Sequence, residues 1–222
     1  MREGFTLTEM LIVVIIIGVL AAGIAPQIKQ YLDSTKATAL TEAINTAIVG
    51  TQSFLTTDSS YGKVTNGQYL VTKGKLNARV EGTVIAVDSS WGVHMNVYGS
   101  DSSGKAATAG AGTAGAGTGT APYAGFFTIE VGDKVAGGAG SMPADVLDAC
   151  VKTVKIFQQK AIKLVSGKKV TGVATGTPYP QVFFGAPGKT SVFAKATDTP
   201  ESVCKKLYDA GAAPSLITAV FR

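Results

Sequence analysis

A single carboxylate, Glu9, lies inside a strongly apolar stretch near the N-terminus of this 222-residue chain. No other charged side chain occurs from Phe5 to Ile28, and the stretch from Met10 to Ala25 has no polar side chain. At about 1.5 Å per residue, such a stretch forms a helix close to the length that crosses a bilayer core. A carboxylate there is costly unless it finds a partner, so Glu9 is the first candidate for a functional residue.

Side chains that support catalysis are scarce elsewhere in the sequence. The sole histidine, His94, lies in an expected strand, where a structural role is favoured over a catalytic one. No Gly-x-Ser-x-Gly, phosphate-binding loop or HExxH motif occurs. The segment 110–115 formally matches the dinucleotide-binding fingerprint, but no convincing strand precedes it and no helix follows. We therefore expect no enzyme activity and no cofactor.

Two ordinary explanations compete for the apolar stretch. A secretory signal peptide has a positive start and a small-residue cleavage site, and Ala21–Gly23 offers such a site. Residues 1–4 of this chain, however, have no net side-chain charge, whereas a signal peptide starts with a positive one. A simple membrane anchor favours flanking lysine or arginine, which are sparse here. Neither explanation accounts for Gly4, Phe5 and Glu9 together.

The apolar stretch continues into an amphipathic segment, which predicts one helix of about fifty residues. Residues 5–28 are apolar on all sides and form a membrane or filament-core segment, and residues 29–55 carry one apolar face. Only lipid or copies of the same chain can satisfy the first half. The apolar positions after the span recur near helical spacing: Ala25, Ile28, Leu32, Ala39, Leu40, Ile44, Ala47 and Ile48.

Three residues weaken the helix where its apolar half ends. Gly18 and Gly23 each cost about 1 kcal/mol relative to alanine, and Pro26 lacks the amide that would bond the carbonyl of Ala22. One interpretation is a mild kink of the kind that membrane helices tolerate. The interpretation we favour is a segment, 18–26, that loosens when the chain leaves lipid for a filament.

Residues 56–222 are long enough for one globular domain with its own core. Short apolar runs between turn formers predict a β-rich, antiparallel sheet packed on the amphipathic half of the long helix, which is an α+β fold. Helices are expected at about Pro143–Val165 and Pro200–Ala210, and residues 102–125, rich in Ala, Gly and Thr, form an exposed loop. The expected strands are Tyr69–Thr72, Ala78–Val80, Val84–Val87, Val93–Tyr98, Phe126–Val131, Val182–Phe184 and Ile217–Phe221.

The run from Gly4 to Leu11, Gly-Phe-Thr-Leu-Thr-Glu-Met-Leu, resembles the class III signal of type IV prepilins. In that family a prepilin peptidase cuts after the glycine and methylates the new N-terminus. The resemblance therefore implies a leader of residues 1–4, cleavage between Gly4 and Phe5, N-methylation of Phe5, and an assembly role for Glu9. A four-residue leader is shorter than usual for the family, which leaves the true translation start open.

The resemblance extends in detail to about residue 55. Gly18 and Pro26 lie where type IVa pilins carry a glycine and a proline, and Tyr31 lies where many carry a tyrosine. The large domain is more similar to type IVb pilins, so the subclass stays open. The resemblance implies a pilin fold and a precursor in lipid at the bacterial inner membrane. It further implies that the pilus assembly machinery there delivers the chain to an extracellular helical homopolymer.

Cys150 and Cys204 are the only cysteines, and each lies in an expected helix. An even count in an exported chain favours a disulfide, and type IVb pilins bridge a similarly long loop near the C-terminus. Metal binding is the alternative, although two cysteines and one histidine make a poor ligand set. We therefore expect extra helices in a disulfide-bounded C-terminal region, and no metal site.

The formal charge of +5 is spread over scattered lysines, which favours a solvated surface over a binding site for nucleic acid. We interpret the chain as a structural subunit of a type IV pilus, and no receptor or nucleic-acid partner is assigned. Within the same family, a type II secretion pseudopilin or a minor pilin is the alternative. A membrane-anchored enzyme or binding module is the remote one.

Overall fold

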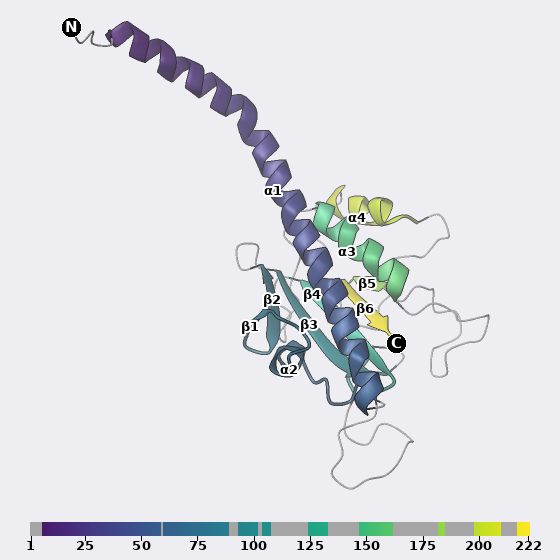
Figure 1. Cartoon of the computed structure of the whole chain (residues 1–222). Coiled ribbons are helices and arrows are strands. Elements are labelled where there is room, and N and C mark those ends of the chain that lie inside the picture. The colour runs from purple at the N-terminus through teal and green to yellow at the C-terminus, as the bar shows by residue number, and fades with distance from the viewer. Residues whose placement is uncertain are drawn as a thin grey trace.

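The apolar run and the amphipathic segment that follows it form one continuous helix, α1 (Leu7–Asp58). At 1.5 Å per residue its 52 residues span about 78 Å. In the computed structural model, the N-terminal half of α1 projects away from the rest of the molecule, and the C-terminal half lies across a β-sheet (Figure 1). The described residues are 6–58, 60–88, 93–101, 104–107, 124–132, 147–161, 182–184, 198–209 and 217–222.

The amphipathic half of α1 buries one face against the domain. Leu40, Ile44 and Ala47 are fully buried and Ile48 nearly so, as their helical spacing predicted. Ala39 was placed on the same face but is exposed, because it lies about 100° around the helix from Leu40. The expected apolar positions nearer the N-terminus, at residues 25, 28 and 32, are also exposed, since they precede the domain.

Within the described residues the sheet has six strands, and every neighbouring pair is antiparallel. Its spatial order is β1-β2-β3-β4-β6-β5, so the C-terminal strand is inserted between β4 and β5. The expected strands from residue 78 onward are confirmed within one or two residues. Their bounds are β1 (Arg79–Glu81), β2 (Val84–Asp88), β3 (Val93–Ser100), β4 (Phe126–Gly132), β5 (Val182–Phe184) and β6 (Ile217–Phe221).

The prediction of a strand at Tyr69–Thr72 is wrong, because this segment belongs to a short helix, α2 (Gly67–Thr72). The side-chain oxygen of Asn66 accepts a hydrogen bond from the Tyr69 amide at 3.1 Å and so caps the helix start. Leu70 is fully buried, and a single helical turn is enough to bury it. Local capping therefore decided the backbone conformation over the β-propensity of the side chains.

Two further helices cover the C-terminal part of the domain, as expected. They are α3 (Leu147–Lys160) and α4 (Pro200–Asp209). Figure 1 shows α3 beside the lower half of α1, with α4 on the far side of α3. The Cys150–Cys204 disulfide joins α3 to α4, with 6.0 Å between the Cα atoms. The α+β class with a disulfide in the C-terminal region is thereby confirmed.

Aromatic side chains fill the core where the end of α1, the sheet and α3 meet. The rings of Phe127 and Phe221 stack at 5.2 Å, Tyr61 approaches Phe127 edge-on at 4.8 Å, and Phe157 approaches Phe221 edge-on at 5.5 Å. All four are buried. Each offset or edge contact stabilises the fold by about 1 kcal/mol beyond the contribution of the buried area. This cluster anchors the C-terminal strand, so the chain end completes the core.

Some expectations lie outside the described residues. They include Gly4, Phe5 and most of the loop predicted at 102–125. In the described part of that loop, Ala106 forms an isolated antiparallel bridge with Ser100.

Candidate functional site

The carboxylate of Glu9, in the first turn of α1, accepts hydrogen bonds from Thr6, the residue that precedes the helix. Its Oε2 accepts hydrogen bonds from the amide and from the hydroxyl of Thr6, both at 2.8 Å. In return, the Glu9 amide donates to the Thr6 hydroxyl at 3.3 Å. This reciprocal pair is a capping box, in which a threonine and a glutamate three residues later satisfy free amides at a helix start. The sequence signal Thr-x-x-Glu was present at residues 6–9, but our reading of the sequence missed it.

The capping box gives Glu9 a role that needs no charge, because glutamine also serves at this position. In the single chain described here, both hydrogen-bond partners of Glu9 come from Thr6, and both residues are exposed. The carboxylate therefore keeps accepting capacity for a further donor.

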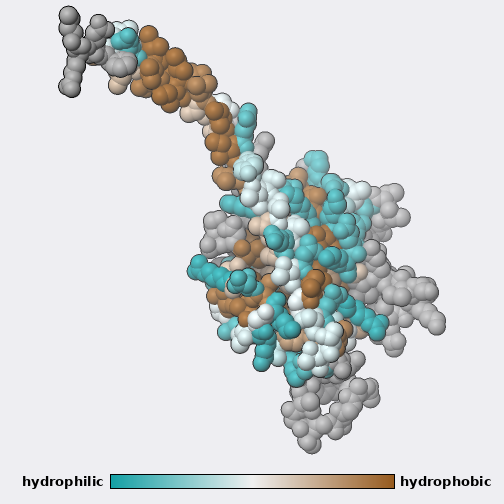
Figure 2. Space-filling model, in the orientation of Figure 1, coloured by the Kyte–Doolittle hydropathy of each residue, from teal (hydrophilic) through white to brown (hydrophobic). Residues whose placement is uncertain are grey.

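The segment after the capping box is an apolar surface without any cover. The helix from Leu7 to Ala25 is long and apolar enough to cross a membrane, and none of it is buried. Its large apolar side chains from Leu7 to Ile28 are between 46% and 84% exposed. Figure 2 shows this half as a continuous hydrophobic rod, in contrast to the mixed surface of the domain. Such a surface needs lipid or other apolar helices around it.

Gly18, Gly23 and Pro26 all lie within the continuous helix α1. A methyl group added at either glycine would meet no atom within 4 Å, so packing inside one subunit does not require glycine there. Figure 1 shows α1 curving in this half. The loosening of residues 18–26 in a filament stays a prediction.

The outer face of the sheet carries a polar cluster that the sequence did not reveal. The hydroxyl of Tyr98 donates to Oε1 of Glu130 at 2.9 Å, and the amide nitrogen of Asn96 lies 3.5 Å from Oε2. Desolvation raises the pKa of Glu130, although these two hydrogen bonds oppose the shift. Burial, together with the neighbouring Glu130, raises the pKa of Tyr98. With its donors in place, this cluster supports the sheet and shows no catalytic arrangement.

His94 lies on the same face of β3 as Asn96 and Tyr98, two residues apart along the strand. Its Nε2 is 3.0 Å from Oε2 of Glu81, and Arg79 contacts the other oxygen of that carboxylate at 3.3 Å. The hydrogen bond from His94 is the main cause that lowers the pKa of Glu81. In the described residues, no group of three or more His, Cys, Asp or Glu side chains is placed to hold a metal ion.

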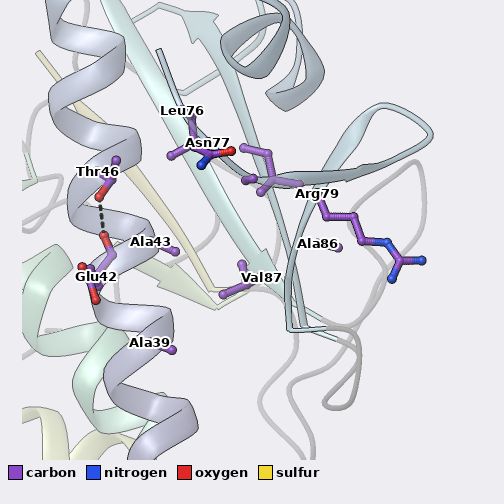
Figure 3. A pocket seen from close by; sticks show the side chains of 11 residues that line it. Ala39, Glu42, Ala43, Thr46, Leu76, Asn77, Arg79, Ala86 and Val87 are labelled. Carbon is purple, nitrogen blue, oxygen red and sulfur yellow. Dashed lines mark hydrogen bonds between the residues drawn. The ribbon is translucent and has the colours of Figure 1, made fainter. Parts of the chain in front are cut away.

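A shallow hollow separates α1 from the β1–β2 hairpin, with a volume of about 530 Å³. In Figure 3, Ala39 and Ala43 point from the helix toward Val87, whereas Glu42 points to the other side of the helix. Arg79 extends away from the hollow. Small apolar side chains dominate its walls, and no nucleophile, base and acid converge there.

Comparison with known proteins agrees with this geometry at the N-terminus. The family model of the prokaryotic N-terminal methylation motif matches residues 1–25. No curated protein matches the chain. The motif and the exposed apolar helix together identify a type IV pilin-like class III signal. They support a type IV pilin-like or pseudopilin family protein, made as a membrane-anchored precursor and then exported, of a kind that is typically not enzymatic.

The motif also implies processing by a prepilin peptidase and assembly into a pilus-like polymer. The match ends at residue 25, so it bears on the signal and the apolar half of α1 and not on the globular domain.

Proposed function

We propose that this chain is the major structural subunit of a type IV pilus. The observation that carries the proposal is the apolar half of α1, in which no residue from Leu7 to Ala25 is buried and which bears the methylation motif. Before assembly this half lies in the inner membrane, and after assembly it packs against the same segment of other copies. The globular domain then faces outward on an extracellular filament.

Processing is the first step of the proposed pathway. The prepilin peptidase cuts between Gly4 and Phe5 and methylates the Phe5 amine. An intact-mass measurement on sheared filaments tests this step and should show a methylated chain that begins at Phe5. Gly4→Val should block cleavage and leave the protein in the membrane fraction. Filaments that retain residues 1–4 would refute the proposed processing.

Glu9 is proposed to pair with the Phe5 amine of a neighbouring subunit. In a bundle of apolar helices an isolated charge is strongly unfavourable, while an opposite pair recovers much of the desolvation cost. Such a pair also sets the axial register of an incoming subunit, because charge pairs restrict geometry more than apolar surfaces do.

The capping box provides a matched pair of variants for this role. Glu9→Gln keeps an acceptor for the capping hydrogen bonds and removes the charge. Thr6→Ala keeps the charge and the bond from the residue 6 amide, and removes the two hydrogen bonds of the hydroxyl. Filament yield should collapse in Glu9→Gln, with processing and membrane insertion intact, and should be much less affected in Thr6→Ala. The opposite order of effects would mean that Glu9 acts through the helix start and not through its charge.

A pseudopilin or minor pilin carries the same motif and is the second candidate. Fractionation distinguishes the two, because a major subunit is abundant in sheared extracellular filaments. A pseudopilin or minor pilin stays in the cell envelope or is a trace component.

Gly18, Gly23 and Pro26 are proposed to let α1 extend locally in the filament.

A further inference from the structure

The outward face of the domain half of α1 is almost uncharged. The exposed side chains described there, from Tyr31 to Thr57, include a single charged one, Glu42. The others are apolar or carry hydroxyl or amide groups: Tyr31, Leu32, Ser34, Thr35, Thr38, Ala39, Thr46, Val49, Gln52, Leu55, Thr56 and Thr57. No ion pair involves Glu42 within the described part of the chain.

A groove with the opposite charge lies on the neighbouring side of this face, between α1 and α3. It has a volume of about 460 Å³ and is lined by Thr38, Thr41 and Asn45 of α1 and by Lys152, Lys155, Ile156, Gln159 and Lys160 of α3. None of its described lining residues carries a carboxylate.

The lysines of the groove differ in their partners. Lys152 is held at 2.9 Å from Asp148 and reaches the Thr38 hydroxyl at 3.3 Å. Lys155 and Lys160 are exposed and form no ion pair with the residues that the structure describes. Two cationic side chains are therefore available at the rim.

Asn45, which lines the groove, has a side-chain oxygen without a hydrogen-bond donor in the described structure. The Oδ1 atom of Asn45 is buried and accepts no hydrogen bond in the described structure. Buried polar atoms are nearly always paired in a complete structure. Because this atom is buried inside the subunit, a docked partner does not reach it. What the single subunit leaves open in the groove is the charge of Lys155 and Lys160.

We propose that the occupant is a second copy of this chain, whose Glu42 pairs with Lys155 and Lys160 across a subunit contact. This inference rests on the proposed filament function. The copies of a helical filament are related by a rotation and a translation along one axis, so in the proposed filament the contact is heterologous. Each copy then offers its own lysines to one neighbour and its own Glu42 to another, and such contacts propagate into open helical assemblies.

Charge complementarity carries the choice of occupant. Lys152, which reaches Ser34 and Thr38 on the face of Glu42, is already paired with Asp148. The carboxylate of Glu42 therefore needs a cation from the partner when it loses water on docking. Within one subunit, Glu42 forms no ion pair with Lys155 or Lys160, although Thr38 lines both the hollow beside Glu42 and the groove with the lysines. The pair fixes the rotational setting of adjacent domains, which the apolar bundle alone determines only loosely.

Charge reversal in the full chain tests the contact, with sheared wild-type filaments as the independent check of the proposed function. Glu42→Lys alone, and Lys155→Glu with Lys160→Glu, should each lower filament yield about tenfold or more. Combining all three substitutions should restore it. Lys73→Glu with Lys75→Glu makes the same change of net charge at two exposed lysines outside the groove and should leave yield unchanged. Unchanged yield in both groove variants would overturn the inference while the filament function stands.

Crosslinking separates contact between subunits from contact within one. Chains carrying only Glu42→Cys and chains carrying only Lys155→Cys are co-expressed and treated with a short bismaleimide. The native cysteines are held in the disulfide and do not react. A mixed dimer in sheared filaments is the expected result. Crosslinks that form only inside a chain carrying both substitutions, with no dimer, would overturn the inference.

Discussion

Reduction of the Cys150–Cys204 disulfide should remove about 4 kcal/mol from the free energy of unfolding of the globular domain. The crosslink spans a sequence separation of 54 residues. In the chain-entropy treatment, a closed loop of that length gives about 4 kcal/mol at 25 °C, because the crosslink restricts the unfolded chain. Domains are usually stable by about 5–15 kcal/mol, so this bond accounts for a large share of the total.

The assay must separate the crosslink from the packing of the sulfur atoms. Both cysteines are fully buried, so alanine substitution would also create cavities. The unfolding of the wild-type chain in detergent micelles is therefore compared with and without reductant, by pulse proteolysis across a urea series. Reduction retains both sulfur atoms in the chain and breaks only the covalent link between them.

The double variant Cys150→Ala with Cys204→Ala serves as the second measurement. It should unfold at lower urea than the reduced wild type, since it loses buried side-chain volume as well as the crosslink. Reductant should not change it further. If the oxidised and reduced wild-type curves coincide within about 1 kcal/mol, the reasoning from loop closure is refuted.

Three further predictions concern the domain and use the same unfolding assay. Leu40→Ala, at a fully buried position of α1, should cost about 3 kcal/mol, whereas Val49→Ala, at an exposed position of the same helix, should change stability by less than about 0.5 kcal/mol. Gly99→Ala should destabilise by about 2 kcal/mol or more, because an added methyl would collide with the carbonyl of Tyr61, and a wild-type curve would contradict the close packing there. Glu130→Gln should become more stable relative to wild type as pH rises from about 4 to about 7. The reason is that burial raises the pKa of Glu130 in the folded state above its ordinary value of 4.5. The stabilising contribution of the protonated carboxyl group is present below that value and is lost as pH rises through the folded pKa. A stability difference between the two proteins that does not depend on pH would contradict this prediction.

Local signals in the sequence were sufficient for much of the architecture. The apolar run and the spacing of Leu40, Ile44 and Ile48 specified α1, because a helix of this length needs only a continuous apolar face and no breaker strong enough to end it. Alternation along β3 placed Val93, Met95 and Val97 on the buried face, since the side-chain period of a strand is two.

The segment at 67–72 shows where local pattern failed. Its β-branched and aromatic side chains favoured a strand, but Asn66 capped a helical turn that packs beside β2 and β3. Position 67 favours glycine, because a Cβ atom added there would lie only 2.9 Å from the Ile85 side chain. Neither the cap geometry nor the close approach to β2 is visible in a propensity pattern.

The N-terminal signal could be recognised from the sequence itself, because the methylation motif consists of consecutive residues, 1–25. Only the tertiary structure could bring Tyr98 to Glu130, since that contact depends on the register of β3 against β4, where Asn96 opposes Glu130. The same holds for the groove between α1 and α3. Thr38 and Lys152 lie 114 residues apart, and their contact at 3.3 Å follows from helix packing over the sheet, which residue order alone does not specify.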